Sequence, residues 1–172
     1  MAFISHYLSP LGGITLASDG ESLTGLWFDG QKYFGQTAGE DCFEKDLPVF
    51  TQTHKWLDAY FSGQEPDFTP PLRMEGTTFQ KEVWKILRTI PYGRTMTYGE
   101  IAAKISGSLG ARLQPGPTRR MSVQAVGGAV GRNPISIIVP CHRVVGADGS
   151  LTGYAAGLQK KQYLLSLEHS NT

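Results

Sequence analysis

The chain has 172 residues, of which 40% are hydrophobic and 18% charged, as in an ordinary globular protein with one large or two small domains. Its start lacks a basic and apolar leader, and no apolar run approaches the roughly 20 residues of a membrane span, so we expect neither a signal peptide nor a transmembrane helix. Cys42 and Cys141 are the only two cysteines, which excludes a disulfide framework and predicts a cytoplasmic protein with free thiols and no metal.

Charge is divided unevenly along the chain. Residues 1–75 carry 4 Lys/Arg and 11 Asp/Glu, a net charge of −7, whereas residues 76–172 carry 12 and 4, a net charge of +8. The asymmetry indicates two domains with different partners, and the basic one is the candidate for binding nucleic acid. Two domains that attract each other would give the same pattern, so charge alone does not decide.

The first half predicts a small antiparallel sheet followed by a helix. Three strand-like segments with turn signals between them open it, at residues 3–8, 14–17 and 23–28. From Val49 to Phe61 apolar residues recur at helical spacing, and Gly63 can end that helix. This apolar stripe is typical of a core-facing helix. A proline-rich segment at 64–76 then marks the boundary between the domains predicted at 1–75 and 76–172.

Three short helices are predicted in the basic half, at residues 78–90, 98–105 and 123–131. Thr77 and Gln80 form a capping box for the first, and Thr97 and Glu100 suit a second box. A Gly- and Pro-rich loop at 107–120 separates the other two. Two short helices in a basic domain are typical of a helix-turn-helix, although most such pairs are only packing units.

The last of these helices contains Gly127 and Gly128. Each costs about 1 kcal/mol relative to alanine inside a helix, so two in succession need a reason. Close approach of nucleic acid and a tight crossing with another helix would both supply one.

A thiol lies where an apolar segment ends. Residues 135–139 are a nearly continuous apolar run that Pro140 breaks, and Cys141, His142 and Arg143 follow. The thiolate is the nucleophilic form of cysteine, and a neighbouring imidazole or cation favours it. An inert buried thiol is the alternative interpretation of the same pattern.

Consecutive side chains rarely point the same way, so we expect a water to bridge Cys141 and His142 rather than a direct contact. Glu168, in a final helix predicted at 158–168, is the candidate to orient the imidazole. These groups would form a Cys–water–His–Glu relay with the logic of a catalytic triad. A solvated Glu168 near the chain end is the alternative.

The segment from Asn133 to Val144, with Pro-Cys-His-Arg intact, resembles the active-site signature of the O6-alkylguanine-DNA alkyltransferases. Other motifs of that family follow the same order, namely Phe79-Gln80, Val83-Trp84, Ile90-Pro91-x-Gly93, Tyr98-x-x-Ile101-Ala102 and Gly153-Tyr154. The resemblance covers residues 77–168, whereas the acidic half resembles the family's variable domain only in general plan.

The resemblance implies an α+β protein. A small N-terminal antiparallel sheet with a helix would precede a mostly helical domain that holds a helix-turn-helix, winged-helix-like, and the active-site cysteine. It implies direct DNA repair, in which an alkyl group moves irreversibly from O6-alkylguanine, or O4-alkylthymine, to Cys141, once per molecule and without a cofactor. The partner is double-stranded DNA whose damaged nucleotide is flipped into a pocket, and no membrane, obligatory protein partner or oligomer is expected.

By similarity, each site residue has an expected role. Cys141 accepts the alkyl group, His142 is the water-linked base and Glu168 orients it, while Asn133 braces the turn and Tyr98 donates to guanine N3. Substrate-binding residues are expected at Arg143, Val144, Tyr154 and Ala155, with backbone groups of Val144 and Ala155 reading the base edge. DNA-binding residues are expected at Arg119, Arg120, Ser122, Gln124 and Ala125.

Three departures from the family pattern bear on these roles. Gln124 stands where the family usually has the arginine that fills the space left by the flipped base. The loop at 107–120 is inserted between the two helices, and its Arg112, Arg119 and Arg120 can offset that loss through phosphate contacts. Ala155-Ala156 replaces a small polar residue and Gly, which narrows the predicted pocket and changes its tolerance for larger alkyl groups.

Two other functions fit parts of the sequence. The first is a helix-turn-helix protein that binds alkylated DNA without transferase activity, against which Cys141 argues. The second is a cysteine hydrolase, which would turn over and need an oxyanion hole. A burst of one product per protein separates a transferase from a hydrolase. The role of Cys42 is open, and Cys42 with His54 makes only a weak case for a metal.

Overall fold

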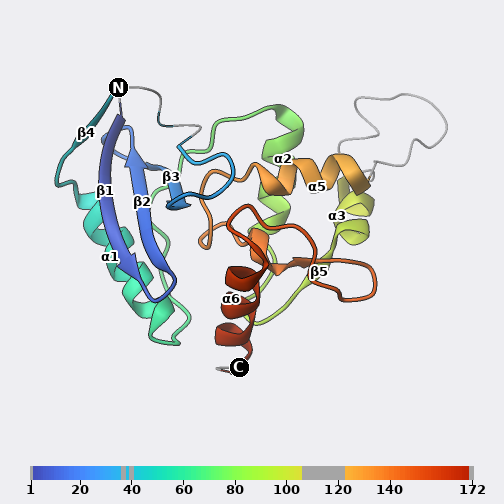
Figure 1. Cartoon of the computed structure of the whole chain (residues 1–172). Helices are drawn as coiled ribbons and strands as arrows, with labels where there is room; N and C mark the ends of the chain where they lie inside the picture. Colours follow the sequence, from blue (N-terminus) through green and yellow to red (C-terminus); the bar gives the residue numbers. More distant parts are fainter. Residues whose placement is uncertain (1, 36–37, 39–40, 106–122, 171–172) are drawn as a thin grey trace.

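The computed structural model describes residues 2–35, 38, 41–105 and 123–170, and shows a sheet with one helix beside a mostly helical half (Figure 1). The first half contains β1 (Ala2–Ser9), β2 (Gly12–Ser18), β3 (Leu23–Phe28), β4 (Cys42–Glu44) and α1 (Pro48–Phe61). The second contains α2 (Thr78–Leu87), β5 (Met96–Thr97), α3 (Tyr98–Ile105), α5 (Val123–Gly131), η2 (Cys141–Arg143), β6 (Val144–Val145) and α6 (Leu158–Ser170). The predicted α+β fold class is confirmed. None of the helices in the described ranges is long and apolar enough to cross a membrane.

The sheet has the strand order β3-β2-β1-β4. The first three strands form the predicted antiparallel meander, with Tyr7 of β1 opposite Ile14 of β2. A fourth strand that was not predicted, β4, pairs parallel to β1, with Phe43 opposite Phe3. With only three residues, β4 is too short to show an alternating pattern in the sequence.

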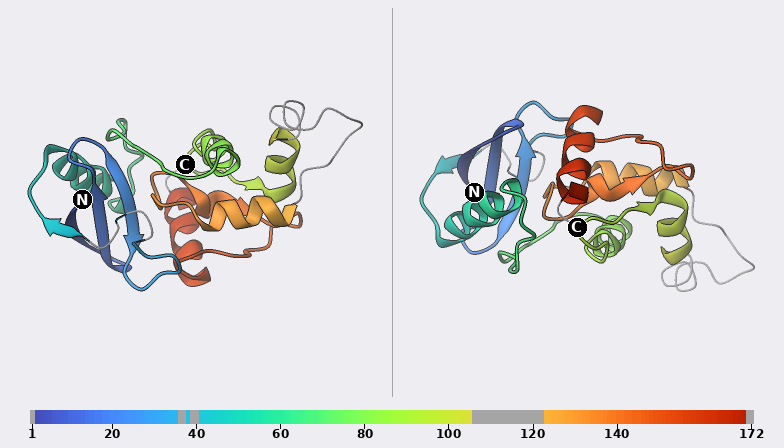
Figure 2. Two further views of the ribbon diagram at one scale, coloured as in Figure 1. Left: turned by 90° about the horizontal axis from the view of Figure 1, so that it is seen from above. Right: turned by 90° about the horizontal axis from the view of Figure 1, so that it is seen from below.

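Helix α1 lies along one face of the sheet (Figures 1 and 2). Pro48 occupies its first turn, where the missing N–H costs no hydrogen bond. Its buried residues recur every three or four positions and are Val49, Phe50, Thr53, Trp56, Leu57 and Tyr60. The predicted core-facing stripe is therefore confirmed.

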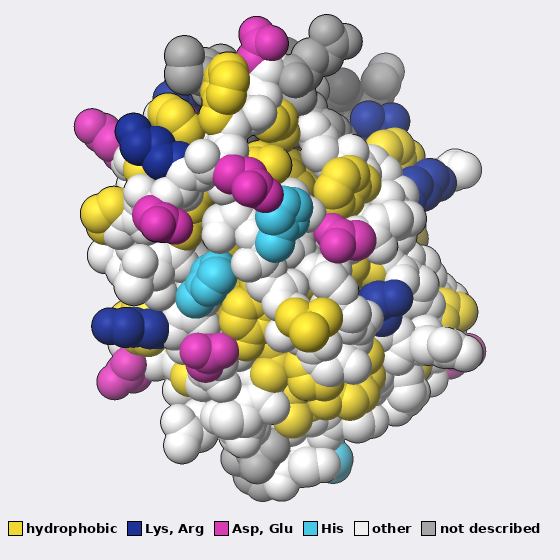
Figure 3. Space-filling model, turned by 60° about the vertical axis from the view of Figure 1, so that its left-hand side comes forward, with side chains coloured by type: hydrophobic (Ala, Val, Ile, Leu, Met, Phe, Trp, Pro, Cys, Tyr) yellow, Lys and Arg dark blue, Asp and Glu magenta, His cyan; other side chains and the backbone are white. Residues whose placement is uncertain are grey.

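Acidic side chains and histidines lie among hydrophobic ones on the face shown in Figure 3. This face is reached by bringing forward the side of the molecule on which Figure 1 places the sheet and α1. The acidic side chains on this face agree with the acidic composition of residues 1–75.

Helices α2, α3 and α5 pack against one another in the second half (Figure 1). The capping box of α2 is confirmed, because Thr77 Oγ1 accepts from the N–H of Gln80 at 3.1 Å and Gln80 Oε1 accepts from the N–H of Thr77 at 3.0 Å. Thr97 Oγ1 likewise accepts from the N–H of Glu100 at 3.0 Å and caps α3. The insertion predicted at 107–120, with Arg112, Arg119 and Arg120, and also Ser122, lies outside the described residues.

Two short strands bring distant motifs together. β5 pairs parallel to β6, with Met96 opposite Val144. Because Tyr98 directly follows β5 and η2 directly precedes β6, this pairing places Tyr98 beside the Pro-Cys-His-Arg turn.

The apolar run 135–139 is buried as predicted, apart from the partly buried Ile138, and it forms a series of turns. The run is bound to the edge strand β3, since Leu26 N–H donates to the Pro134 carbonyl at 2.9 Å and Ser136 N–H donates to the Leu26 carbonyl at 3.0 Å. Ile137 has a φ of +70°, which a β-branched residue rarely adopts. The surrounding contacts therefore hold the chain in a strained turn just before the cysteine.

Candidate active site

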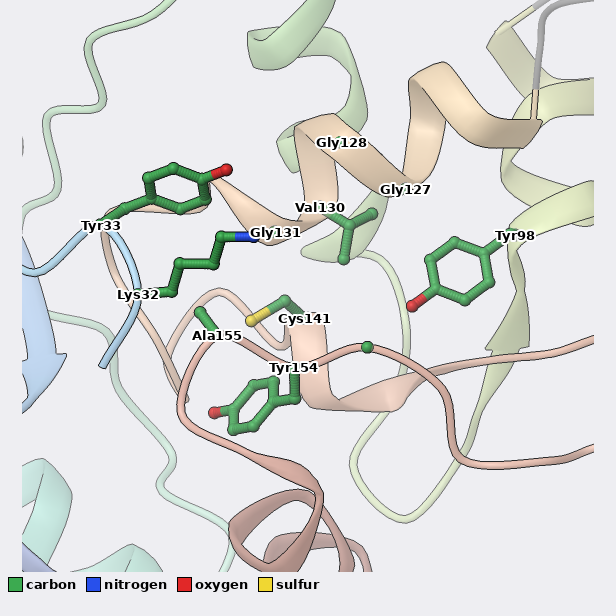
Figure 4. Close-up of a pocket in the computed structure, with 11 residues that line it drawn as sticks. Lys32, Tyr33, Tyr98, Gly127, Gly128, Val130, Gly131, Cys141, Tyr154 and Ala155 are labelled. Carbon is green, nitrogen blue, oxygen red and sulfur yellow. The ribbon is translucent and has the colours of Figure 1, made fainter. Parts of the chain in front are cut away.

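Cys141 lies at a cavity of about 280 Å³ (Figure 4). The second half of the chain provides most of its lining, namely Tyr98, the C-terminal end of α5, Cys141 and residues 153–155. Lys32 and Tyr33, from the loop after β3, also line it. Sequence reasoning missed these two, because they belong to the acidic half and show no periodicity or motif.

The turn that carries Cys141 is braced by Asn133, which is buried. Asn133 Nδ2 donates to the Val139 carbonyl at 2.7 Å, and its Oδ1 accepts from the N–H of Ile135 at 3.0 Å. The chain then enters the single 3-10 turn of η2 after Pro140. This bracing fixes the position of the thiol relative to the cavity.

His142 and Glu168 form a fully buried pair, with His142 Nε2 and Glu168 Oε2 2.5 Å apart. A carboxylate only accepts hydrogen bonds, so the contact places a hydrogen on Nε2 and leaves the Nδ1 lone pair of a neutral imidazole free to accept a proton. Nδ1 is buried and has no hydrogen-bond partner among the residues described here. The alternative of a solvated Glu168 was wrong, since its side chain is 1% exposed.

The carboxylate of Glu168 accepts from four further donors. These are Tyr60 Oη at 2.6 Å, Arg143 Nε at 2.8 Å, Arg143 Nη2 at 3.1 Å and the N–H of Gly93 at 3.1 Å. Burial raises the pKa of Glu168, but the hydrogen bonds and charges of His142 and Arg143 outweigh it and hold the pKa at about 2. Glu168 is therefore ionised at neutral pH.

Arg143 does not line the cavity. Its guanidinium contacts Glu168, and Nη1 donates to the Ile90 carbonyl at 2.8 Å. The expectation that Arg143 binds substrate is therefore corrected. It follows Cys141 and His142 in a tight turn and points away from the cavity, where it neutralises the buried carboxylate.

The thiol and the imidazole are both neutral at rest. Burial raises the pKa of Cys141 to about 11, and this is offset only in part by Asn133, by the charge of Lys161 and by backbone N–H groups. Burial also lowers the pKa of His142, although Glu168 opposes this shift. At neutral pH the protein therefore holds a thiol and not a thiolate at Cys141.

A second cation, Lys161 of α6, is also fully buried. Its Nζ donates to the carbonyls of Thr152 at 2.9 Å and Gly153 at 3.1 Å, and Tyr98 Oη donates to the same Thr152 carbonyl at 2.9 Å. Burial lowers the pKa of Lys161 to about 8. Sequence reasoning missed this residue, although Lys161 lies seven positions before Glu168 and therefore on the same face of the helix, which was a usable signal.

The remaining predicted substrate-binding residues lie around this loop. Tyr154 and Ala155 line the cavity, and the Ala155 carbonyl accepts from the N–H of Lys32 at 3.0 Å. Val144 is fully buried in β6 and is not among the lining residues. The loop thus joins the cavity to the first half of the chain.

Helix α5 presents small residues to the cavity. A Cβ at Gly128 would meet nothing within 4 Å, and one at Gly127 would meet only the ring of Tyr98, at 3.9 Å. A tight helix crossing therefore does not account for the two glycines, and space beside the cavity does. Gln124 and Ala125 lie on the exposed first turn of the same helix.

Comparison with known proteins agrees with this geometry. The family model described as the DNA binding domain of 6-O-methylguanine DNA methyltransferase matches residues 78–170, and the one described as its ribonuclease-like domain matches residues 3–74. The methylated-DNA–protein-cysteine methyltransferase of Methanosarcina acetivorans is 46% identical over 98% of this chain and 99% of its own length. That of Haemophilus influenzae is 41% identical over 96% and 86%.

Among solved structures, the OGT protein of Mycobacterium tuberculosis in complex with DNA superimposes with a TM-score of 0.82, at 44% identity over 99% of this chain and 94% of that one. An O6-methylguanine DNA methyltransferase from Methanococcus jannaschii gives a TM-score of 0.59 at 30% identity, over 93% and 90%. The family models match both halves of the sequence, and the fold matches solved structures of the family. The chain therefore belongs to the 6-O-methylguanine DNA methyltransferase family.

Proposed function

We propose that this protein repairs DNA by transferring an alkyl group from O6 of an alkylated guanine to Sγ of Cys141, irreversibly and once per molecule. The observation that carries the proposal is the position of Cys141 at a cavity, in the same short turn as His142, which forms a buried pair with Glu168. Family membership and the names of its relatives support the same activity.

The transfer needs one proton to leave the thiol and one to reach the base. A bridging water carries the Cys141 proton to Nδ1 of His142, and the resulting imidazolium is stabilised by Glu168. Sγ attacks the alkyl carbon, the bond from that carbon to O6 breaks, and its electron pair stays on the guanine. Tyr98 lies across the cavity from Cys141 (Figure 4) and donates a hydrogen bond or proton to N3 of the leaving base.

The product is a thioether, which has no good leaving group. Nothing in the site regenerates the thiol, so each molecule acts once and needs no cofactor. A hydrolase built on Cys141 would instead release its product and turn over. The alternative of a protein that binds alkylated DNA without repairing it is not favoured, because Cys141 and its relay are present.

The DNA contacts are proposed on α5. Its exposed first turn, with Gln124 and Ala125, would enter the minor groove, and the open side along Gly127 and Gly128 would admit the flipped nucleotide. Arg119, Arg120 and Ser122, just before α5, are proposed to add contacts, although they lie outside the described residues. The M. tuberculosis relative was solved in complex with DNA, which supports a DNA partner here.

The finer assignments remain our proposals. Tyr154 and Ala155 would hold the flipped base, with the backbone at Val144 and Ala155 reading its edge. Ala155-Ala156 would narrow the site for large alkyl groups, and activity on O4-alkylthymine would be lower. The domains at 1–75 and 76–172, the monomeric state and a cytoplasmic location stay predictions.

Intact-protein mass spectrometry after incubation with duplex DNA containing one O6-methylguanine tests the function. We expect a gain of one methyl group per protein, which peptide mapping places on Cys141. Cys141→Ser should bind the same DNA without a mass change. Turnover beyond one product per protein would indicate a hydrolase, and unmodified wild-type protein that still binds the lesion would indicate a damage-binding protein.

A further inference from the structure

Tyr60 connects the first half of the chain to the chemistry of the second. It lies on α1 and is fully buried, and its Oη is 2.6 Å from Glu168 Oε2, the oxygen that also contacts His142. Sequence reasoning placed Tyr60 in the apolar stripe of α1. A core-facing stripe explains why the Tyr60 ring is buried, stacked on Trp56 at 5.3 Å between centroids. It does not explain the hydrogen bond of the Tyr60 hydroxyl.

We propose that Tyr60 is a positioning residue of the alkyl transfer, supplied by the N-terminal half, which together with Glu168 keeps the hydrogen of His142 on Nε2 and so leaves Nδ1 as the base. This inference rests on the proposed function and adds a group to its relay.

The directions of the hydrogen bonds around Glu168 define the tautomer of His142. The Tyr60 hydroxyl donates to Glu168, because an ionised carboxylate offers no hydrogen. Its oxygen is 3.5 Å from His142 Nε2, so Nε2 faces two acceptors, the carboxylate at 2.5 Å and the phenol oxygen. A neutral imidazole satisfies both only when Nε2 carries its hydrogen. If the hydrogen were on Nδ1, the lone pair of Nε2 would face lone pairs of the Glu168 carboxylate and of the Tyr60 oxygen.

Tyr60 also changes how strongly the charge on Glu168 acts on His142. By donating to Oε2, Tyr60 shares the negative charge that would otherwise act on His142 alone. Burial and the Glu168 charge raise the pKa of Tyr60 well above its ordinary value, so the hydroxyl keeps its hydrogen throughout the working range. Removing it would leave Glu168 a stronger acceptor, stabilise the imidazolium and raise the pKa of His142.

Other ionisable groups face this cluster from every element packed around it. They are Tyr92 in the segment after α2, Cys141 and Arg143 in η2, Tyr154 in the loop before α6, and Lys161 on α6. Among the described residues, Tyr60 is the group from the first half that hydrogen-bonds to Glu168. Tyr60→Phe removes one oxygen from this set and leaves the ring in place.

The test is the pH dependence of single-turnover methyl transfer. We expect Tyr60→Phe to transfer about tenfold more slowly at pH 6, with the acid limb of its rate profile shifted to higher pH, and to bind DNA like the wild type. Tyr7→Phe is the matched control, since it removes an exposed tyrosine-to-carboxylate hydrogen bond of 2.7 Å, to Asp58 of α1, that involves neither Glu168 nor His142. Its profile should match that of the wild type.

A wild-type rate for Tyr60→Phe, or the same fractional loss at every pH, would overturn the proposal. A second measurement avoids the variant. Nitrogen-15 NMR of histidine-labelled wild-type protein at neutral pH should show His142 with its hydrogen on Nε2, and a hydrogen on Nδ1 would refute the argument. Failure of the wild type to methylate Cys141 would instead refute the proposed function.

Discussion

Glu168→Gln tests whether the buried carboxylate is held in its charged form, as the geometry requires. The substitution keeps the shape of the side chain and removes its charge. Arg143, which is 9% exposed, would then face an amide. Removing one partner of a buried ion pair is costly, because the other charge stays buried and uncompensated.

The pKa of Glu168 gives the magnitude. A fall from the ordinary 4.5 to about 2 corresponds to about 3 kcal/mol of folding free energy, with each pKa unit contributing about 1.4 kcal/mol. Since the folded pKa is depressed, this stability is fully present above pH 4.5 and is lost as the pH falls toward 2. The Glu168 side chain is 1% exposed, so screening by solvent reduces this stabilisation only slightly.

Urea denaturation at pH 5 and pH 3 measures the effect. We expect the wild type to exceed Glu168→Gln by about 3 kcal/mol at pH 5, and the gap to narrow by about 2 kcal/mol at pH 3. Glu100→Gln, at an exposed carboxylate of α3, reports the effect of removing a surface charge. A gap that is equal at the two pH values would refute the reasoning.

Three further predictions concern the loop, the base and the DNA contacts. Lys161→Met should lower the free energy of unfolding by about 2 kcal/mol, because two carbonyls lose a charged donor; chemical denaturation would contradict it by showing wild-type stability. Tyr98→Phe should slow single-turnover transfer by about 100-fold with unchanged DNA affinity, and equal losses in both would count against a role at N3. Arg119→Ala combined with Arg120→Ala should weaken DNA binding and flatten its salt dependence, whereas an unchanged slope in a binding titration would remove these residues from the interface.

Local patterns in the sequence predict the helices well. The apolar spacing from Val49 onward gives α1, which is observed at Pro48–Phe61, and the Thr77 box gives the start of α2. These signals are local, since a helix is fixed by contacts between neighbouring turns. β4 was missed because its pairing with β1 joins residues about 40 positions apart, which no short window contains.

The residues of the candidate site likewise divide into those with a local sequence signal and those brought together by long-range contacts. Cys141 and His142 are adjacent in the chain, so a segment of a few residues is enough to predict a reactive thiol. Glu168 could be named only as one of few carboxylates in the basic half, because nothing in its surroundings shows that α6 buries it. Tyr60 and Lys32 belong to the other half of the chain. Periodicity shows the helix or loop that holds each of them, but not that Tyr60 contacts Glu168 or that Lys32 lines the cavity.

The resting state suits a protein that can react only once. A permanently ionised thiolate would be consumed by any available electrophile or oxidant, and each such event would cost a whole molecule. Burial instead keeps the pKa of Cys141 near 11 and leaves His142 neutral. In the proposed mechanism the thiolate forms only when a proton moves along the relay, and that step is favourable when an alkylated base is present to accept the charge that the attack releases. In that mechanism the hydrogen bonds that hold the Glu168 charge in place serve selectivity as much as rate.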